Sequence, residues 1–347
     1  MMERGLERLE LLSKACLFRN AQGPAFAALA ELKELFSMQT NFFARKFCCP
    51  STSLAPVLLP SPRETHFWYI LPDEVHNESL LKQYMTVLSP CERDYVISIK
   101  EDDLKKKAIL ARVLVRTTLA RYTGYQVSPQ SLKFRKNIFG KPEVLWQLDK
   151  KWNPPLLHFN MSHTSSLIAC GVTTNAQIGI DVEEKQRKIK HNIAAFARRY
   201  FSPQEAEFLN TFSDPERQRK EFLKLWTLKE AYVKALGRGF SAAPFKTFNL
   251  QLKTDGGKKI QATSLSDAEV VLETLDDQHD LSTNWQFALF QLAGSHYAAI
   301  CVEKETNIES KETDLLRLQA WKTVPFVEDE YVSGTNAVIP FSGISGD

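Results

Sequence analysis

Two short apolar segments near the middle of the chain constrain its fold more than any other feature. Residues 167–172 form a continuous apolar run, and residues 177–183 alternate Ile178, Ile180 and Val182 with other side chains. Segments of this length and pattern are typical of buried β-strands. Because only a short connection separates the two segments, we expect them to form neighbouring strands.

Helical periodicity flanks these strands on both sides. Apolar side chains recur at helical spacing over residues 104–122, and residues 217–236 carry an apolar stripe that stops at Gly237. Shorter helices are expected at 193–200 and 203–210, and further strands at 67–70, 245–252 and 285–292. Strands and helices occur in both halves of the chain, which predicts an α+β fold with two subdomains.

The length of the chain guides the expected domain boundaries. At 347 residues it exceeds one ordinary domain, so about two packed units are expected. We predict one subdomain at residues 66–175 and a second at 176–305. Residues 1–65 are predicted to be an N-terminal extension, and residues 306–347 a charged, irregular C-terminal tail in which no chemistry is visible.

The N-terminal extension contains a segment with two interpretations. Residues 37–63 have no acidic residue, several Ser, Thr and Pro, and a few Arg and Lys. With translation starting at Met38, this composition is that of an organellar presequence, which predicts a mitochondrial or plastid protein. The alternative is a plain linker, which predicts a cytosolic enzyme.

Composition argues against several classes of protein. A hydrophobic share of 44% and a charged share of 24% match an ordinary globular protein. The six cysteines form no C-x-x-C pair and no zinc-binding spacing, which indicates a reduced compartment. No apolar run approaches the ~18 residues needed to cross a bilayer, so no membrane span is expected.

Charge is unevenly distributed along the chain. The formal net charge of +3 is too small to demand nucleic acid as a partner, and none is expected. Residues 93–141, however, hold 12 Lys and Arg against 4 Asp and Glu. This stretch is therefore a candidate dock for a phosphate-rich polyanion.

A pair of acidic residues ends the second apolar segment. In Gly179-Ile180-Asp181-Val182-Glu183, Asp181 and Glu183 lie two residues apart and so share one face of a strand. Magnesium prefers oxygen ligands and often retains substrate phosphates, so this pair is a candidate Mg²⁺ site, with Gly179 leaving space for a ligand. The alternative interpretation is a solvated strand end.

The helix expected at residues 217–236 carries a second candidate group. Glu230 and Lys234 lie one turn apart within it, roughly opposite the apolar stripe. As a surface ion pair they would contribute only ~0.3 to 0.5 kcal/mol to stability. Both interpretations, surface pair and reactive pair, fit the spacing alone.

Two polar segments precede the acidic strand. Asn160-Met161-Ser162-His163 gathers an amide, a hydroxyl and an imidazole where a loop could bind phosphate. Further upstream, cations accompany a glycine that lets the backbone approach a ligand closely, in the group Arg135, Lys136, Gly140, Lys141 and Pro142. The alternatives are a structural histidine and an ordinary basic turn.

Four motifs follow one another along the chain: G-K-P, N-x-S-H, G-I-D-x-E and W-x-x-K-E-x-x-x-K. In this order they resemble the large, two-subdomain phosphopantetheinyl transferase family. The resemblance covers about residues 88–303 and is greatest for the eukaryotic branch that acts with aminoadipate-semialdehyde dehydrogenase. It implies a pair of α+β halves related by a pseudo-twofold axis, with the active site at their interface.

The resemblance also implies roles for individual residues. Asp181, Glu183 and Glu230 would bind Mg²⁺, although some family members keep only the outer two of these acids. Glu230 and Lys234 would be catalytic. The residues that would bind coenzyme A are Gly140, Lys141, Pro142, Ser162 and His163. Arg93 and Lys136 are added with less support.

The implied activity is that of a holo-[acyl-carrier-protein] synthase, working as a monomer in fatty acid synthesis. A serine of an apo acyl carrier protein would attack the β-phosphate of coenzyme A and expel adenosine 3′,5′-bisphosphate, which demands that negative charge be held on the diphosphate. Two alternatives stay open: another Mg²⁺-dependent phosphoryl or nucleotidyl transferase, and a non-catalytic module that binds polyanions.

Overall fold

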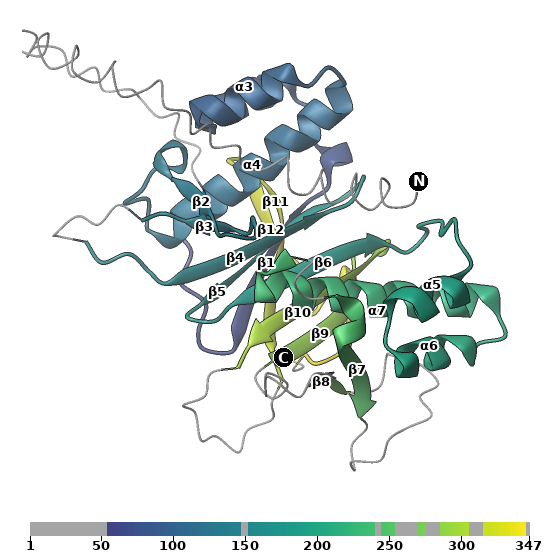
Figure 1. The fold of residues 1–347 in the computed structure, drawn as a ribbon. Helices are drawn as coiled ribbons and strands as arrows, with labels where there is room; N and C mark the ends of the chain where they lie inside the picture. Colours follow the sequence, from purple (N-terminus) through teal and green to yellow (C-terminus); the bar gives the residue numbers. More distant parts are fainter. Residues whose placement is uncertain are drawn as a thin grey trace, which may run out of the picture.

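The structure is a computed structural model that describes residues 54–146, 152–239, 244–253, 269–274, 285–304 and 315–344. Its strands form two main sheets and two small hairpins (Figure 1). The five-stranded sheet has the order β12 (Glu328–Tyr331), β11 (Arg317–Val324), β1 (Glu64–Ile70), β5 (Ile168–Thr174), β4 (Leu157–His163). The four-stranded sheet has the order β13 (Val338–Ser342), β9 (Trp285–Leu292), β10 (His296–Glu303), β6 (Ile178–Glu184).

The hairpins are β2 (Phe134–Lys136) with β3 (Pro142–Val144), and β7 (Phe248–Lys253) with β8 (Glu269–Thr274). The helices are α2 (Glu78–Val87), α3 (Pro90–Ser98), α4 (Asp102–Tyr122), α5 (Ile193–Tyr200), α6 (Pro203–Asn210) and α7 (Pro215–Leu236). Single 3₁₀ turns lie at η2 (Pro72–Glu74), η3 (Pro129–Ser131) and η4 (Phe245–Thr247). The expected α+β class is therefore confirmed, as are the helices that the sequence periodicity predicted.

The helices and sheets form layers, and three apolar cores lie between these layers. Side chains of α4 pack against one face of the five-stranded sheet, and those of α7 against one face of the four-stranded sheet. The remaining faces of the two sheets pack on each other, with Phe67 and Tyr69 of β1 opposite Ile180 of β6 in one cluster. Each half therefore contains one long helix packed on one sheet. The two sheets face each other in the middle of the molecule.

The close approach of α7 to β6 depends on a glycine. A Cβ atom built on Gly179 would lie 2.0 Å from the carbonyl oxygen of Ala231 and 2.2 Å from the nitrogen of Ala235. Both are backbone atoms of α7, so no side chain fits there. The sequence interpretation gave Gly179 the task of leaving space for a ligand, whereas in the structure it leaves space for the helix.

The expectation of an irregular C-terminal tail was wrong for residues 315–344. β11 lies inside the five-stranded sheet, parallel to β1, and β13 forms the edge of the four-stranded sheet next to β9. Leu318 and Ala320 of β11 are buried between the sheets, and Trp321 stacks on Trp68 with ring centroids 4.3 Å apart. These buried contacts are what fix the segment.

The expected N-terminal extension is also folded in part. Residues 54–63 lie beside the end of α4, where Tyr125 Oη donates to the Leu54 carbonyl at 2.6 Å and Arg121 Nε to the Ala55 carbonyl at 2.9 Å. The rest of the acid-free stretch, 37–53, lies outside the described residues, and its targeting role stays a prediction. No helix in the described part of the chain has the length and apolarity to cross a membrane.

Candidate active site

The two sheets meet along β4 and β6, which are edge strands of their respective sheets. No backbone ladder joins them. Instead, Ile180 N donates to Asn160 Oδ1 at 2.9 Å, and Val182 N donates to Ser162 Oγ at 3.2 Å. Buried backbone N–H groups at a strand edge need a partner, and side chains of β4 supply it. Asn160 and Ser162 of the N-x-S-H motif therefore join the two halves.

Asp181 lies at the centre of this junction. It is 5% exposed, and its Oδ1 accepts from Lys234 Nζ at 2.6 Å and from Ser162 Oγ at 2.9 Å. Lys234 Nζ also donates to Ser162 Oγ at 3.0 Å, which closes a triangle of one residue each from α7, β4 and β6. The second oxygen, Oδ2, is buried without a hydrogen-bond partner. A buried carboxylate oxygen left in this state is an acceptor that a cation would satisfy.

Glu183 adds a second carboxylate two residues along β6. Burial, and after it the negative charge of Asp181, raise its pKa to about 7, against the opposing effect of Arg187. Arg187 forms an ion pair with Glu183 Oε1. Two carboxylates that repel each other in a partly buried site are stabilised by a bound cation, so Asp181 and Glu183 fit the predicted Mg²⁺ site.

The third predicted metal ligand is not brought into the same group. Glu230 lies half-buried on α7, one turn before Lys234. Among the residues that the structure describes, no three His, Cys, Asp or Glu side chains are arranged to hold a metal ion. The three-carboxylate set therefore stays a prediction, whereas Lys234 does lie at the centre of the site.

Lys141 points into the junction rather than toward solvent. Its Nζ donates to the carbonyls of Ile178 at 3.0 Å and Ala235 at 3.1 Å, and to Gln177 Oε1 at 3.3 Å. Burial lowers its pKa to about 8. Asn137 of the same turn donates from Nδ2 to the Gly237 carbonyl at 2.8 Å. This turn thus fastens the first half to the end of α7, and a phosphate contact would require Lys141 to leave these three acceptors.

The other predicted coenzyme A contacts surround this turn and the end of β4. Gly140 has a φ of +94° between β2 and β3, and Pro142 begins β3. Lys136 ends β2 with an exposed side chain. His163 ends β4 directly after Ser162, and its pKa is lowered by burial and then by the positive charge of Lys234. These roles stay predictions.

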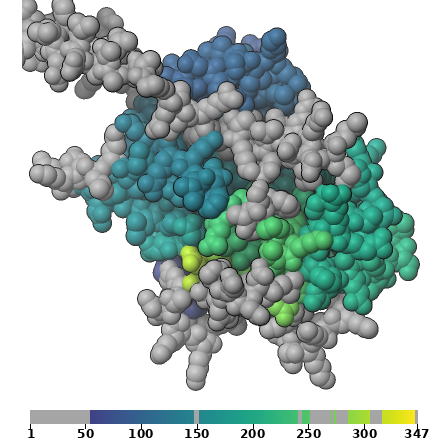
Figure 2. Space-filling view, viewed as in Figure 1, coloured from purple at the N-terminus to yellow at the C-terminus, as the bar shows by residue number. Residues whose placement is uncertain are grey.

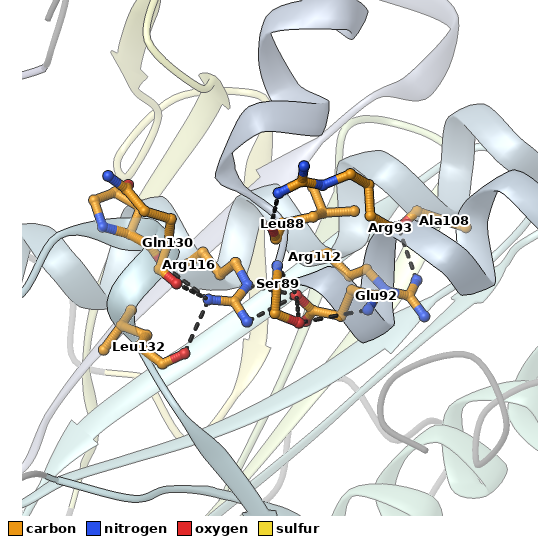
Figure 3. A network of polar contacts seen from close by, with 10 residues as sticks. Leu88, Ser89, Glu92, Arg93, Ala108, Arg112, Arg116, Gln130 and Leu132 are labelled. Carbon is orange, nitrogen blue, oxygen red and sulfur yellow. Dashed lines mark hydrogen bonds and ion pairs between the residues drawn. The ribbon is translucent and has the colours of Figure 1, made fainter. Parts of the chain in front are cut away.

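The basic stretch 93–141 is partly used inside the protein. Arg116 is 2% exposed, forms an ion pair with Glu92 at 2.7 Å and donates to the Leu132 carbonyl at 3.0 Å (Figure 3). Arg112, in the same network, is also 2% exposed and donates to the Ala108 carbonyl. Arg93 is exposed on α3, but its guanidinium donates to the Leu88 carbonyl. Net charge along the sequence therefore overstates the cations available to a ligand.

Sequence reasoning missed a buried ion pair between α6 and α7. Lys229 Nζ lies 2.7 Å from both carboxylate oxygens of Glu205 and donates to the Phe248 carbonyl at 2.9 Å. Glu205 also accepts from Leu250 N and, as part of a capping box, from Ser202 N. The Ser-Pro-x-Glu pattern signals the capping box, but nothing local signals that Lys229 completes it.

Comparisons with known proteins match this chain to transferases. The model of the 4′-phosphopantetheinyl transferase superfamily matches residues 177–301. A 4′-phosphopantetheinyl transferase of Bacillus subtilis is 33% identical over 171 residues, which cover 49% of this chain and 67% of the relative. HetI, a 4′-phosphopantetheinyl transferase of Nostoc sp., is 33% identical over 178 residues, covering 51% and 70%.

Sfp, a 4′-phosphopantetheinyl transferase of Bacillus subtilis strain 168, is 29% identical over 180 residues, covering 52% of this chain and 73% of the relative. Among solved structures, the holo-[acyl-carrier-protein] synthase of Thermotoga maritima is similar with 23% identity and a TM-score of 0.26. That match covers 37% of this chain and 64% of the other.

Proposed function

The chain belongs to the 4′-phosphopantetheinyl transferase superfamily, and we propose that it transfers the phosphopantetheine arm of coenzyme A to a serine of an apo acyl carrier protein, as a holo-[acyl-carrier-protein] synthase. The observation that supports this most is the triangle of Asp181, Ser162 and Lys234, with its unpaired carboxylate oxygen. It places an acceptor for a cation and a fixed ammonium group within one site.

Asp181 and Glu183 would hold Mg²⁺, with Glu230 as the third predicted ligand. A bound Mg²⁺ would screen the negative charge of the diphosphate. In the transfer, the serine oxygen forms a bond to the β-phosphorus while the bond to the oxygen of adenosine 3′,5′-bisphosphate breaks. Glu230 would accept the serine proton, and Lys234 would stabilise or protonate the departing phosphate.

The carrier protein would dock beside α7 on a basic surface. Between Glu184 and Tyr200 the chain has no acidic residue, and four exposed cations lie on this segment, namely Lys188, Lys190, Arg198 and Arg199. In Figure 1, α5 and α6 lie together at one end of α7, and in Figure 2 the blue-green residues of this part of the chain form one side of the molecule. Positive charge next to the carboxylates of β6 favours a partner with an acidic surface and speeds its encounter with the site.

The decisive experiment incubates the protein with Mg²⁺, coenzyme A and apo carrier proteins and weighs the carrier by mass spectrometry. We expect a mass gain of one phosphopantetheine that requires both coenzyme A and Mg²⁺. Transfer of phosphate or nucleotide from another donor instead would support the alternative phosphoryl or nucleotidyl transferase. No covalent product with any carrier would contradict the proposed activity.

Variants of α7 test the assignment of catalytic residues. We expect Glu230→Gln and Lys234→Ala to lower single-turnover transfer by on the order of 10² at saturating coenzyme A and Mg²⁺. Lys220→Ala, a change of an exposed lysine on the same helix, is the matched control. Folded variants that transfer within about threefold of wild type, under ~0.7 kcal/mol in barrier, would refute the roles of Glu230 and Lys234.

We further propose that the enzyme acts as a monomer in fatty acid synthesis and in mitochondria. The acid-free segment 37–63 supports the location. A fluorescent reporter fused to residues 38–70 tests it, and a reporter spread through the cytosol would favour the linker interpretation. Sedimentation velocity of the purified chain tests the oligomeric state.

A further inference from the structure

The contacts between β4 and β6 continue beyond the candidate site. Asn160 and Ser162 accept two hydrogen bonds from β6, and the loop that follows β4 makes a third connection to the second half. Ser165 and Ser166 both donate to Glu184 Oε1, Ser166 at 2.8 Å. The three connections thus fall at every second residue of β6, at positions 180, 182 and 184.

His296 completes this third connection. It lies on β10 directly opposite Glu184 and is 1% exposed. Its Nε2 is 2.9 Å from Thr164 Oγ1 and 3.2 Å from Ser166 Oγ, while its Nδ1 is 2.9 Å from Ser295 Oγ. Burial lowers the pKa of His296, which favours a neutral ring.

The hydrogen-bond partners define the direction of this contact. Ser295 Oγ donates to the Ala293 carbonyl at 3.2 Å, so toward His296 it accepts from Nδ1. In a neutral ring Nε2 is then the acceptor, to which Thr164 Oγ1 can donate. We call Glu184, His296 and the hydroxyls of Thr164, Ser165 and Ser166 the polar clamp.

A serine–histidine hydrolase is the rival interpretation of this group. Ser166 lies close to the His296 ring, but its hydroxyl donates to Glu184. The Nδ1 atom, which a carboxylate would orient in a catalytic triad, contacts Ser295 instead. The geometry therefore supports a holding role rather than a nucleophile.

We propose that the polar clamp is a positioning device, in which Glu184 and His296 fix the end of β4 so that Ser162 holds Asp181 in the geometry needed for transfer. This inference rests on the proposed function. The loop follows Ser162 and His163 directly, so releasing it frees the strand end that carries both. Small displacements of positioning groups cost large factors in rate, because the reacting atoms must be aligned.

The test deletes single contacts of the clamp in the full chain. We expect Glu184→Ala and Ser166→Ala to lower kcat by roughly tenfold or more, with the KM for the carrier protein within about twofold of wild type. Ser166→Thr keeps the hydroxyl and should restore most of the rate. Ser98→Ala, which removes an exposed hydroxyl on α3, is the matched control.

Hydrogen exchange supplies a readout that does not depend on activity. We expect the amides of Ile180 and Val182 to exchange on the order of tenfold faster in both clamp variants, while amides of the β9–β10 ladder keep their protection. Unchanged exchange at Ile180 and Val182, or kcat within threefold of wild type, would overturn the proposal. So would a uniform loss of protection that includes β9 and β10, because the clamp would then be merely structural. A wild-type protein that transfers nothing would refute the proposed function, and the exchange data would still decide whether the clamp holds β4.

Discussion

Replacing Lys229 by methionine should destabilise the protein more than any change at an exposed lysine. The Lys229 side chain is fully buried, its ammonium contacts both oxygens of Glu205, and it donates to the Phe248 carbonyl. Burial lowers the pKa of Lys229 to about 8, although the negative charge of Glu205 opposes this shift. The buried site therefore disfavours the charged form of Lys229 relative to water. Methionine matches the length of the stem but leaves Glu205 as an uncompensated buried carboxylate.

The expected magnitude follows from that uncompensated charge. Removing one partner of a buried ion pair costs about 3 to 5 kcal/mol, and for a protein of this size that lowers Tm by roughly 4 to 7 °C. Glu205 keeps the donors Ser202 N and Leu250 N, which limits the loss. Chemical denaturation at neutral pH measures the loss in unfolding free energy. Lys220→Met, at an exposed position of α7, is the control.

A double variant separates lost charge balance from lost packing. Lys229→Met combined with Glu205→Gln removes both charges, so we expect it to regain at least half of the stability lost in Lys229→Met. The reasoning is refuted if Lys229→Met costs less than about 1 kcal/mol, or if the double variant is no more stable than the single one.

Two further predictions concern the contacts of α7. The pKa of Lys141 lies near 8, below its ordinary value of 10.5, so between these values the unfolded chain binds more protons and wild-type stability should rise with pH relative to Lys141→Met. A difference in unfolding free energy that stays constant from pH 8 to pH 10 would contradict this. Gly179→Ala should cost about 3 kcal/mol or more, because its Cβ would overlap the backbone at Ala231 and Ala235. An unfolding free energy within about 1 kcal/mol of wild type would show that α7 can move away.

Local patterns in the sequence predicted the elements that carry the site. Alternation placed Ile178, Ile180 and Val182 toward the core and so Asp181 on the opposite face of the strand, and the central cluster confirms the buried side. Apolar periodicity and Gly237 likewise predicted α7, which ends where Gly237 adopts a φ of 62°. These features depend on residues that are neighbours in the chain.

Features that depend on distant partners were not predictable from one sequence. Lys141 has its acceptors on β6 and α7, so its cationic side chain gave no sign that it would turn inward. Alternation of Leu316, Leu318 and Ala320 was a readable strand signal in the C-terminal segment, but the charged residues around it obscured the pattern. Its pairing with β1 joins positions at opposite ends of the described chain.

The position of β11 has a consequence for synthesis on the ribosome. Nearly the whole described chain separates β1 from β11, its parallel neighbour in the five-stranded sheet. This sheet therefore stays incomplete until β11 and β12 leave the ribosome. Until then β1 presents an unpaired edge, with Trp68 lacking its stacking partner Trp321. We therefore expect the nascent chain to be prone to aggregation during the interval in which β1 has been synthesised and β11 has not.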